Sequence, residues 1–114
     1  MQSTMMNFPL TLPHLLERAG KLFPKEEIVT RLPDKSLHRY TFGDFYRRSR
    51  KLASALQKAG LQKGDRVATL SWNTYAHLEA YFGIPVAGGF CTPSTCGFTP
   101  RISPTSSTTP RIAF

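Results

Sequence analysis

The side chains that could bind a metal or form a covalent intermediate are few and widely separated. They are three histidines and two cysteines: His14, His38, His77, Cys91 and Cys96. Zinc sites draw their ligands from closely spaced pairs, and the histidines have no such spacing. Two cysteines are too few for a disulfide framework and have no companion ligands for zinc. The sequence therefore predicts surface or structural histidines, and it contains no recognisable Ser-His-Asp, Cys-His or paired-carboxylate arrangement.

Trp72 and Asn73 form a candidate ligand-binding loop, because they follow the apolar, strand-like segment 66–70. In α/β proteins, ligands bind just beyond the carboxyl ends of the strands. The alternative is that Asn73 caps the next helix and that Trp72 is a packed aromatic ring. The sequence favours the cap over the binding loop.

A cluster of basic residues lies on one predicted helix and comprises Arg47, Arg48, Arg50, Lys51 and Lys58. The chain has 15 Lys and Arg against 7 Asp and Glu, which gives a net charge of +8. Such a balance fits nucleic-acid or anionic-membrane binding, or a chain that lacks acidic segments. The cluster lies mostly off the apolar helix face and has no interleaved aromatic residues, so it predicts a solvated face and no nucleic-acid partner.

Hydrophobic periodicity before Gly89 predicts a small α/β unit, since helix, strand and helix with short connections build a parallel sheet. At 114 residues and 40% hydrophobic content, the chain forms one globular domain at most. The expected elements are a helix from Thr11 to Pro24, a hairpin of strands 27–32 and 37–40, a helix capped by Thr41 and Asp44 and stopped at Gly60, a buried strand 66–70, and a helix from Asn73 into Gly83 and Pro85.

Three runs of residues, in this order, resemble the opening of the adenylate-forming acyl-CoA synthetases. They are YTFGDF at 40–45, RKLASAL at 50–56 and GDRVATL at 64–70. The block WNTYAHLEAYF at 72–82, with Pro85, Gly88 and Gly89, is similar to the bacterial fatty acid–CoA ligase branch. The resemblance covers residues 8–89 and implies a partial N-terminal subdomain of an adenylate-forming enzyme: helix, hairpin, helix, parallel-type strand, helix.

The composition changes after Gly89. Residues 90–114 contain four prolines, many Ser and Thr residues, both cysteines and no acidic residue. Their few large apolar side chains follow neither the helix period nor the strand period, so we expect disorder from Phe90 onward. The expected organisation is a truncated N-terminal part of an AMP-binding domain at 1–89, followed by a frame-shifted tail at 90–114.

A second reading frame of the tail restores the family pattern. The resembling family continues with Leu-His-Thr-x-Asn-x-Arg-Leu and then Asp-Ile-Ala-Tyr-Ile. Codons for residues 90–97, regrouped by one base, can encode Leu-Leu-His-Thr-Leu-Asn-Leu-Arg, and the following codons can encode Leu-His-Pro-Glu-Asp-Ile-Ala-Tyr-Ile. The interpretation is loss of one base near the codons for Gly88 and Gly89.

Residues 104–111, PTSSTTPR, are similar to the phosphate loop Thr-Ser-Gly-Thr-Thr-Gly-x-Pro-Lys-Gly of the same family. Ser107 and Pro110 replace both loop glycines, and no lysine follows. Glycines let backbone amides close on a phosphate, and proline removes an amide donor. The similarity is therefore interpreted as coincidence.

The resemblance implies a parent enzyme that activates a fatty acid with ATP and Mg²⁺ and transfers the acyl group to coenzyme A. Its reactive residues lie beyond the matching segment, so we expect no catalytic, cofactor-binding or metal-binding residue in this chain, and no cofactor. The chain itself is expected to be inactive. The apolar stretch near Tyr81 is too short to span a bilayer, and the N-terminus has no signal-peptide pattern. The sequence therefore predicts a cytoplasmic protein.

Two alternatives belong to other classes: a small basic interaction module with a disordered tail, and a nucleic-acid binder supported by charge alone. For the ligase fragment, the strand at 67–70 would lack its neighbours in the sheet. Its unpaired edges then predict a marginally folded chain that self-associates or aggregates.

Overall fold

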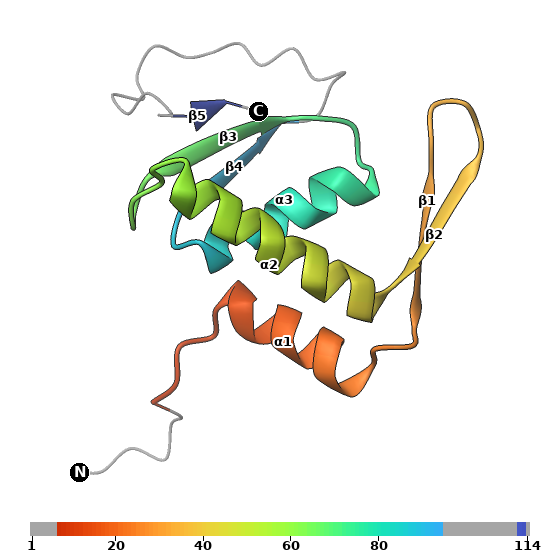
Figure 1. Ribbon diagram of the computed structural model, residues 1–114, viewed down its shortest axis with the longest axis horizontal. Helices are drawn as coiled ribbons and strands as arrows, with labels where there is room; N and C mark the ends of the chain where they lie inside the picture. Colours follow the sequence, from red (N-terminus) through yellow and green to blue (C-terminus); the bar gives the residue numbers. More distant parts are fainter. Residues whose placement is uncertain (1–6, 95–111, 114) are drawn as a thin grey trace.

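The computed structural model describes residues 7–94 and 112–113 and has two small sheets and three helices (Figure 1). The elements are α1 (Leu12–Leu22), β1 (Glu27–Arg31), β2 (Leu37–Thr41), α2 (Phe42–Lys58), β3 (Arg66–Leu70), α3 (Tyr75–Val86), β4 (Phe90–Ser94) and β5 (Ile112–Ala113). Antiparallel β1 and β2 form the hairpin, while parallel strands form the second sheet in the order β4-β3-β5. The predicted α/β class and the order helix, hairpin, helix, strand, helix are confirmed.

The hairpin turn is formed by local polar contacts. Asp34 accepts hydrogen bonds from the Ser36 amide at 3.1 Å and from the Ser36 hydroxyl at 2.6 Å. The hydroxyl bond is the main reason that the pKa of Asp34 is lowered. Lys35 has a φ of 66°, which short turns between antiparallel strands require. The predicted turn chemistry of residues 33–36 therefore produces the hairpin.

Helix α2 begins at the predicted Thr41 N-cap, but Asp44 contacts the Thr41 hydroxyl rather than its backbone amide, so the cap is not a full capping box. The Thr41 hydroxyl accepts from the Asp44 amide at 3.2 Å and donates to Asp44 Oδ2 at 2.9 Å. The Thr41 contact, followed by the Arg47 contact, lowers the pKa of Asp44. The helix ends at Gly60, whose φ of 97° allows the Leu61 amide to reach the Leu56 carbonyl at 3.0 Å. Both ends of α2 were thus predictable from neighbouring residues.

Helix α3 differs from the sequence prediction at both ends. Its N-cap is Thr74 rather than Asn73, and the helix continues through Gly83 and Pro85 to Val86. Pro85 has no amide to donate to the Tyr81 carbonyl, but it is the residue before the last of the helix, so any bend it causes affects only the end of α3. Beyond the end of the helix, Gly88 has a φ of 95°, and the Gly89 amide donates to the Ile84 carbonyl at 3.0 Å.

The prediction of disorder from Phe90 onward is wrong for β4 and β5. The Phe90 amide donates to the Asp65 carbonyl at 2.8 Å, and β4 then runs parallel to β3 with Val67 opposite Cys91 and Thr69 opposite Pro93. Backbone pairing alone can hold such a strand, and proline is tolerated in a strand at the edge of a sheet. The rest of the predicted tail lies outside the described residues.

The prediction that β3 lacks neighbours is also wrong. In the described part of the chain, β4 pairs along the full length of β3, and β5 pairs with Val67 and Ala68 on the other side. Strand β3 is therefore the central strand, and its buried Val67 and Thr69 side chains lie within a formed sheet.

Two apolar clusters hold the elements together. The first joins α2, α3 and the sheet, and its buried members are Ala53, Leu56, Leu61, Val67, Ile84 and Ala87. The second joins α1, the hairpin and α2 through Leu16, Tyr40 and Phe45. In Figure 1, α2 and α3 lie on one side of the parallel sheet, and α1 packs on the far side of these helices.

We predict that Gly20→Ala separates α1 from α2. A Cβ at Gly20 would lie 2.6 Å from both Cβ and Cγ of Tyr46, closer than real carbon contacts allow. Alanine improves helix propensity by about 1 kcal/mol, but overpacking typically costs ~1–3 kcal/mol. Urea unfolding should therefore show a lower midpoint. Glu17→Ala, which removes only an exposed pair with Lys21, is the control and should change stability by less than ~0.5 kcal/mol. A raised midpoint for Gly20→Ala would contradict the close helix contact.

Candidate functional site

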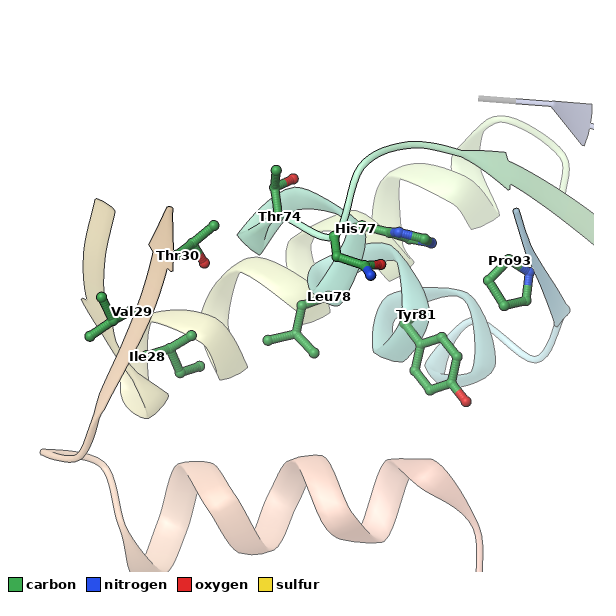
Figure 2. A pocket seen from close by; sticks show the side chains of 9 residues that line it. Ile28, Val29, Thr30, Thr74, His77, Leu78, Tyr81 and Pro93 are labelled. Carbon is green, nitrogen blue, oxygen red and sulfur yellow. The ribbon is translucent and has the colours of Figure 1, made fainter. Parts of the chain in front are cut away.

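An open pocket of about 590 Å³ lies between β1, the first half of α3 and the end of β4 (Figure 2). The pocket is lined by Ile28, Val29, Thr30, Asn73, Thr74, His77, Leu78, Tyr81 and Pro93. Its volume falls in the range of small-molecule sites, which are mostly apolar with a few polar groups. The pocket is the candidate site because the predicted ligand loop after β3 borders it.

The polar side of the pocket comes from the loop after β3 and the first turns of α3. Asn73 and Thr74 line it, and His77 lies nearby with only 8% of its surface exposed. The His77 Nε2 atom is 3.2 Å from the Thr69 hydroxyl, which ties α3 to β3. Trp72 is 61% exposed and is not part of the lining. Of the two residues predicted to form a binding loop, the structure places Asn73, but not Trp72, at a cavity.

The other two histidines pack against aromatic rings. The His14 ring lies 4.5 Å from the Phe8 ring, and the His38 ring lies 4.2 Å from the Tyr75 ring. In the described part of the chain, no three His, Cys, Asp or Glu side chains are grouped as metal ligands would be. The structure does not bring the three histidines together.

Cys91 is a free, half-buried thiol on β4. Burial raises its pKa, and a hydrogen bond with Thr69 opposes that shift. A raised pKa keeps the thiol protonated at neutral pH, where it is a weak nucleophile. Cys96 lies outside the described residues, as does the loop-like stretch 104–111.

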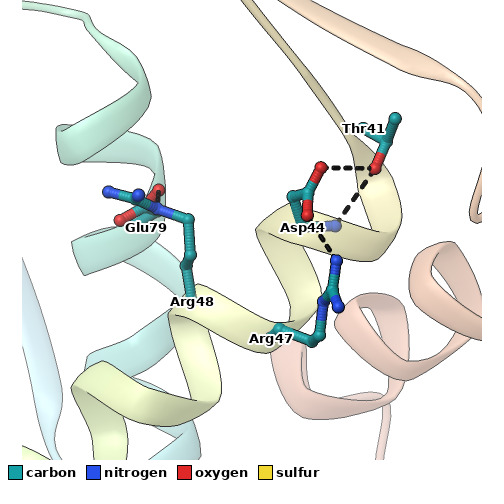
Figure 3. A network of polar contacts seen from close by, with 5 residues as sticks. All are labelled: Thr41, Asp44, Arg47, Arg48 and Glu79. Atoms are coloured by element: carbon teal, nitrogen blue, oxygen red, sulfur yellow. Dashed lines mark hydrogen bonds and ion pairs between the residues drawn. The ribbon is translucent and has the colours of Figure 1, made fainter.

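The predicted solvated face is confirmed, since all five members of the basic cluster are exposed, although three of them also contact other side chains. Arg47 pairs with Asp44, and Arg48 pairs with Glu79 (Figure 3). Arg50 donates to the Tyr46 hydroxyl at 2.9 Å. The remaining two members of the cluster, Lys51 and Lys58, are exposed as predicted. Carboxylates therefore compensate the charges of Arg47 and Arg48, whereas Arg50 contacts a neutral hydroxyl.

Glu79 is the residue that the sequence analysis missed. Its side chain is 11% exposed, and its Oε1 accepts from Arg48 Nε at 2.5 Å. The Arg48 guanidinium also lies 5.6 Å from the centre of the Tyr75 ring. Arg48 therefore contacts two residues of α3, Tyr75 and Glu79. A single carboxylate in the otherwise apolar segment 75–86 is the signal that could have predicted a buried ion pair.

Tyr40 joins the hairpin to the helices. Its ring packs edge-on against Phe45 at 6.4 Å and Tyr75 at 5.9 Å, and its buried hydroxyl has no hydrogen-bond partner among the described residues. Burial, followed by the negative charge of Glu79, raises the pKa of Tyr40 to about 12. Its role is structural, since an unionised phenol with no partner favours neither proton transfer nor metal binding.

The residues of the pocket do not fit ATP with Mg²⁺. Magnesium sites use carboxylate oxygens, and nucleotide phosphates require positive charges or clustered amides. The lining contains no Asp, Glu, Lys or Arg side chain. No step of nucleotide chemistry is therefore assigned to the described residues.

The arrangement of a parallel sheet covered by two helices, with a hairpin beside them, is shared with a solved adenylate-forming enzyme. The fatty acid AMP ligase from Legionella pneumophila matches with a TM-score of 0.67 and 22% identity, over 75% of this chain and 15% of that chain. At this identity the match establishes the fold alone. It confirms the expected α/β fold class.

Residues 16–102 match the family of AMP-binding enzymes, and the chain belongs to that family. The match continues past Gly89. Among its relatives, the long-chain-fatty-acid–CoA ligase of Thermus thermophilus is 44% identical over 90% of this chain and 18% of its own length. The 3-methylmercaptopropionyl-CoA ligase of Ruegeria lacuscaerulensis is 37% identical over 80% of this chain and 17% of its own length. The chain thus spans less than a fifth of these relatives.

No helix in residues 7–94 is long and apolar enough to cross a bilayer. This finding concerns only the described part of the chain.

We predict that Arg48→Ala destabilises the chain more than Arg47→Ala. Removing Arg48 leaves the buried Glu79 carboxylate uncompensated, but Arg48 is half exposed, so we expect ~1–3 kcal/mol rather than the larger cost of a fully buried pair. The Arg47 and Asp44 side chains are both well exposed, and losing that pair should cost less than ~1 kcal/mol. In a double-mutant cycle by urea unfolding, Arg48→Ala and Glu79→Gln should be clearly less than additive. Additive effects would show that the pair contributes nothing.

We predict that Tyr40 makes stability fall at high pH. Because its folded pKa is raised, its contribution is fully present below the unfolded pKa of about 10 and is lost as the pH rises through about 12. Tyr40→Phe should lose less stability between these values than the parent chain, as measured by urea unfolding at a series of pH values. At pH 7 the substitution should cost less than ~1 kcal/mol, since no hydrogen bond is broken. Tyr81→Phe, at an exposed tyrosine, is the control and should follow the parent chain.

Proposed function

We propose that this chain is the N-terminal part of an ATP-dependent fatty acid–CoA ligase, which converts a fatty acid, ATP and coenzyme A into acyl-CoA, AMP and pyrophosphate in the cytoplasm. The observation that carries the proposal is the 44% identity, over 90% of the chain, to a long-chain-fatty-acid–CoA ligase. The block at 72–82 supports the fatty-acid branch. ATP, Mg²⁺ and coenzyme A would be bound by parts of the enzyme that this chain does not contain.

The domain proposal places the change of reading frame at residues 88–90, with the AMP-binding domain at 1–89 and a frame-shifted tail at 90–114. Strand β4 can form under this proposal, because the backbone turn that leads into it involves Gly88, Gly89 and Asp65. The half-buried Cys91 packs against the apolar cluster of α2, α3 and β3. A leucine, encoded there in the restored frame, would fill the same place with more apolar surface.

We predict that the 114-residue chain has no fatty-acid-dependent pyrophosphate release above a heat-inactivated control. Activation of a fatty acid needs preorganised groups that stabilise developing charge on phosphate, and the described pocket lacks them. The gene with one base restored near codons 88–90 and translated downstream should yield a protein that releases pyrophosphate only with a fatty acid, ATP and Mg²⁺.

One outcome would contradict the predicted inactivity of the chain, and another would contradict the function. Pyrophosphate release by the unaltered chain would show that the chain is itself catalytic. Stop codons immediately downstream in the restored frame would instead favour a small basic protein with an interaction role.

A further inference from the structure

Helix α1 carries large apolar side chains that the fold leaves uncovered. Leu16 is the one residue of this helix that is buried, and it packs into the second apolar cluster. Leu15 and Leu22 are instead 56% and 59% exposed. Because they are seven residues apart, they lie in one stripe along the helix. The chain on either side of the helix adds three more exposed apolar side chains: Phe8, Leu10 and Phe23.

These side chains form a group rather than a scatter. Eleven large hydrophobic side chains are exposed among the described residues, and five of them lie within residues 8–23. Single exposed hydrophobic residues are normal on a protein surface, whereas a group of them marks an interaction site. We call the exposed side chains of residues 8–23 the α1 surface.

Basic side chains lie among the apolar ones on the α1 surface. Arg18 comes three residues after Leu15 and four before Leu22, so it belongs to the same stripe. Lys21 pairs with Glu17 at 3.4 Å and so offsets the one acidic charge of the helix. Long basic side chains can lay their apolar stems along a hydrophobic surface while their charged ends reach phosphate or water. The α1 surface is therefore amphipathic, and its polar members are mainly basic.

The basic cluster of α2 adjoins helix α1. The two helices are in close contact, since a Cβ at Gly20 would lie 2.6 Å from Tyr46 Cβ. The Tyr46 hydroxyl accepts from Arg50, whose guanidinium lies 5.5 Å from the centre of the Tyr46 ring. Positive charge from α2 thus borders α1.

We propose that the α1 surface docks on the surface of an anionic lipid bilayer. Arg18 meets the lipid phosphates, and Leu15 and Leu22 enter the boundary between headgroups and acyl chains. Amphipathic helices with large apolar residues and with Lys and Arg lie in the plane of a bilayer surface in this way. Their binding adds the burial of apolar area to the attraction of basic residues to anionic lipids.

Charge complementarity selects this occupant. The net charge of +8 is attracted to an anionic bilayer and repels a second copy of the chain. A nucleic acid would meet the charge but would leave the exposed leucines of α1 in water. The inference goes beyond the proposed function and does not depend on it, because it concerns only residues that this chain contains.

The test is flotation of the 114-residue chain with lipid vesicles on a density gradient, which separates vesicle-bound protein from aggregates. The chain should float with vesicles of equimolar phosphatidylcholine and phosphatidylglycerol and remain at the bottom with phosphatidylcholine alone. Added salt should weaken the binding, because it screens the attraction between basic residues and anionic lipids.

Two pairs of variants separate the α1 surface from the rest of the chain. Leu22→Ser should lower the partition coefficient about 10-fold, whereas Leu37→Ser, at a 57% exposed leucine of the hairpin, should leave it unchanged. Arg18→Gln should lower it about fivefold, whereas Arg31→Gln, at the end of β1, should change it less than twofold. All four side chains are exposed, so the far-UV circular dichroism of each variant should match that of the parent chain.

Three outcomes would overturn the proposal. Equal flotation with both kinds of vesicle would show that anionic lipid is not recognised. Equal losses for Leu22→Ser and Leu37→Ser would show that α1 is not the contact. Absence of flotation, together with retention by a DNA duplex that Arg18→Gln weakens and Leu22→Ser does not, would identify a nucleic acid as the occupant instead.

Discussion

The close approach of α2 and α3 at Gly83 determines how the other elements are placed. A Cβ at this position would lie 3.0 Å from Leu52 Cδ2 and 3.1 Å from the Ser49 carbonyl oxygen, so a side chain there would require these neighbours to shift by a few tenths of an ångström. The contact brings Ile84 into the cluster with Ala53 and Leu56, on which β3 rests. It also brings Arg48 within reach of Glu79. The sheet, the ion pair and the position of the pocket all depend on this short distance between two helices.

Tight packing has a cost at the same place. The Ser49 side chain is fully buried, and its hydroxyl has no hydrogen-bond partner among the described residues. An unsatisfied buried polar group typically costs ~1–3 kcal/mol. Ser49 lies on the face of α2 that contacts α3, where its carbonyl oxygen is 3.1 Å from the position of a Cβ at Gly83. The contact between α2 and α3 therefore contains a buried side chain whose hydroxyl forms no hydrogen bond among the described residues.

The features that were predictable from sequence are those fixed by residues close together in the chain. The Thr41–Asp44 cap, the turn at residues 33–36 and the stop at Gly60 each depend on contacts within five residues. Strand β4 was missed because its composition is unfavourable and its pairing with β3 joins residues more than twenty positions apart. Arg48 and Glu79 were missed for the same reason. Of the candidate site, the sequence located Asn73 after β3, but the cavity depends on β1 and Pro93, whose approach to α3 only the folded chain reveals.

The order of β3, α3 and β4 along the chain also bears on how the polypeptide folds during synthesis. These elements form a continuous βαβ unit, in which each strand lies beside the next one to be made. Together with the hairpin and α2, they can assemble as soon as residue 94 has left the ribosome, because N-terminal parts of a chain generally fold first. A longer nascent chain would then carry this unit as a formed nucleus with the pocket beside α3 still open. The remaining polypeptide would fold onto an existing surface instead of building one from an extended chain.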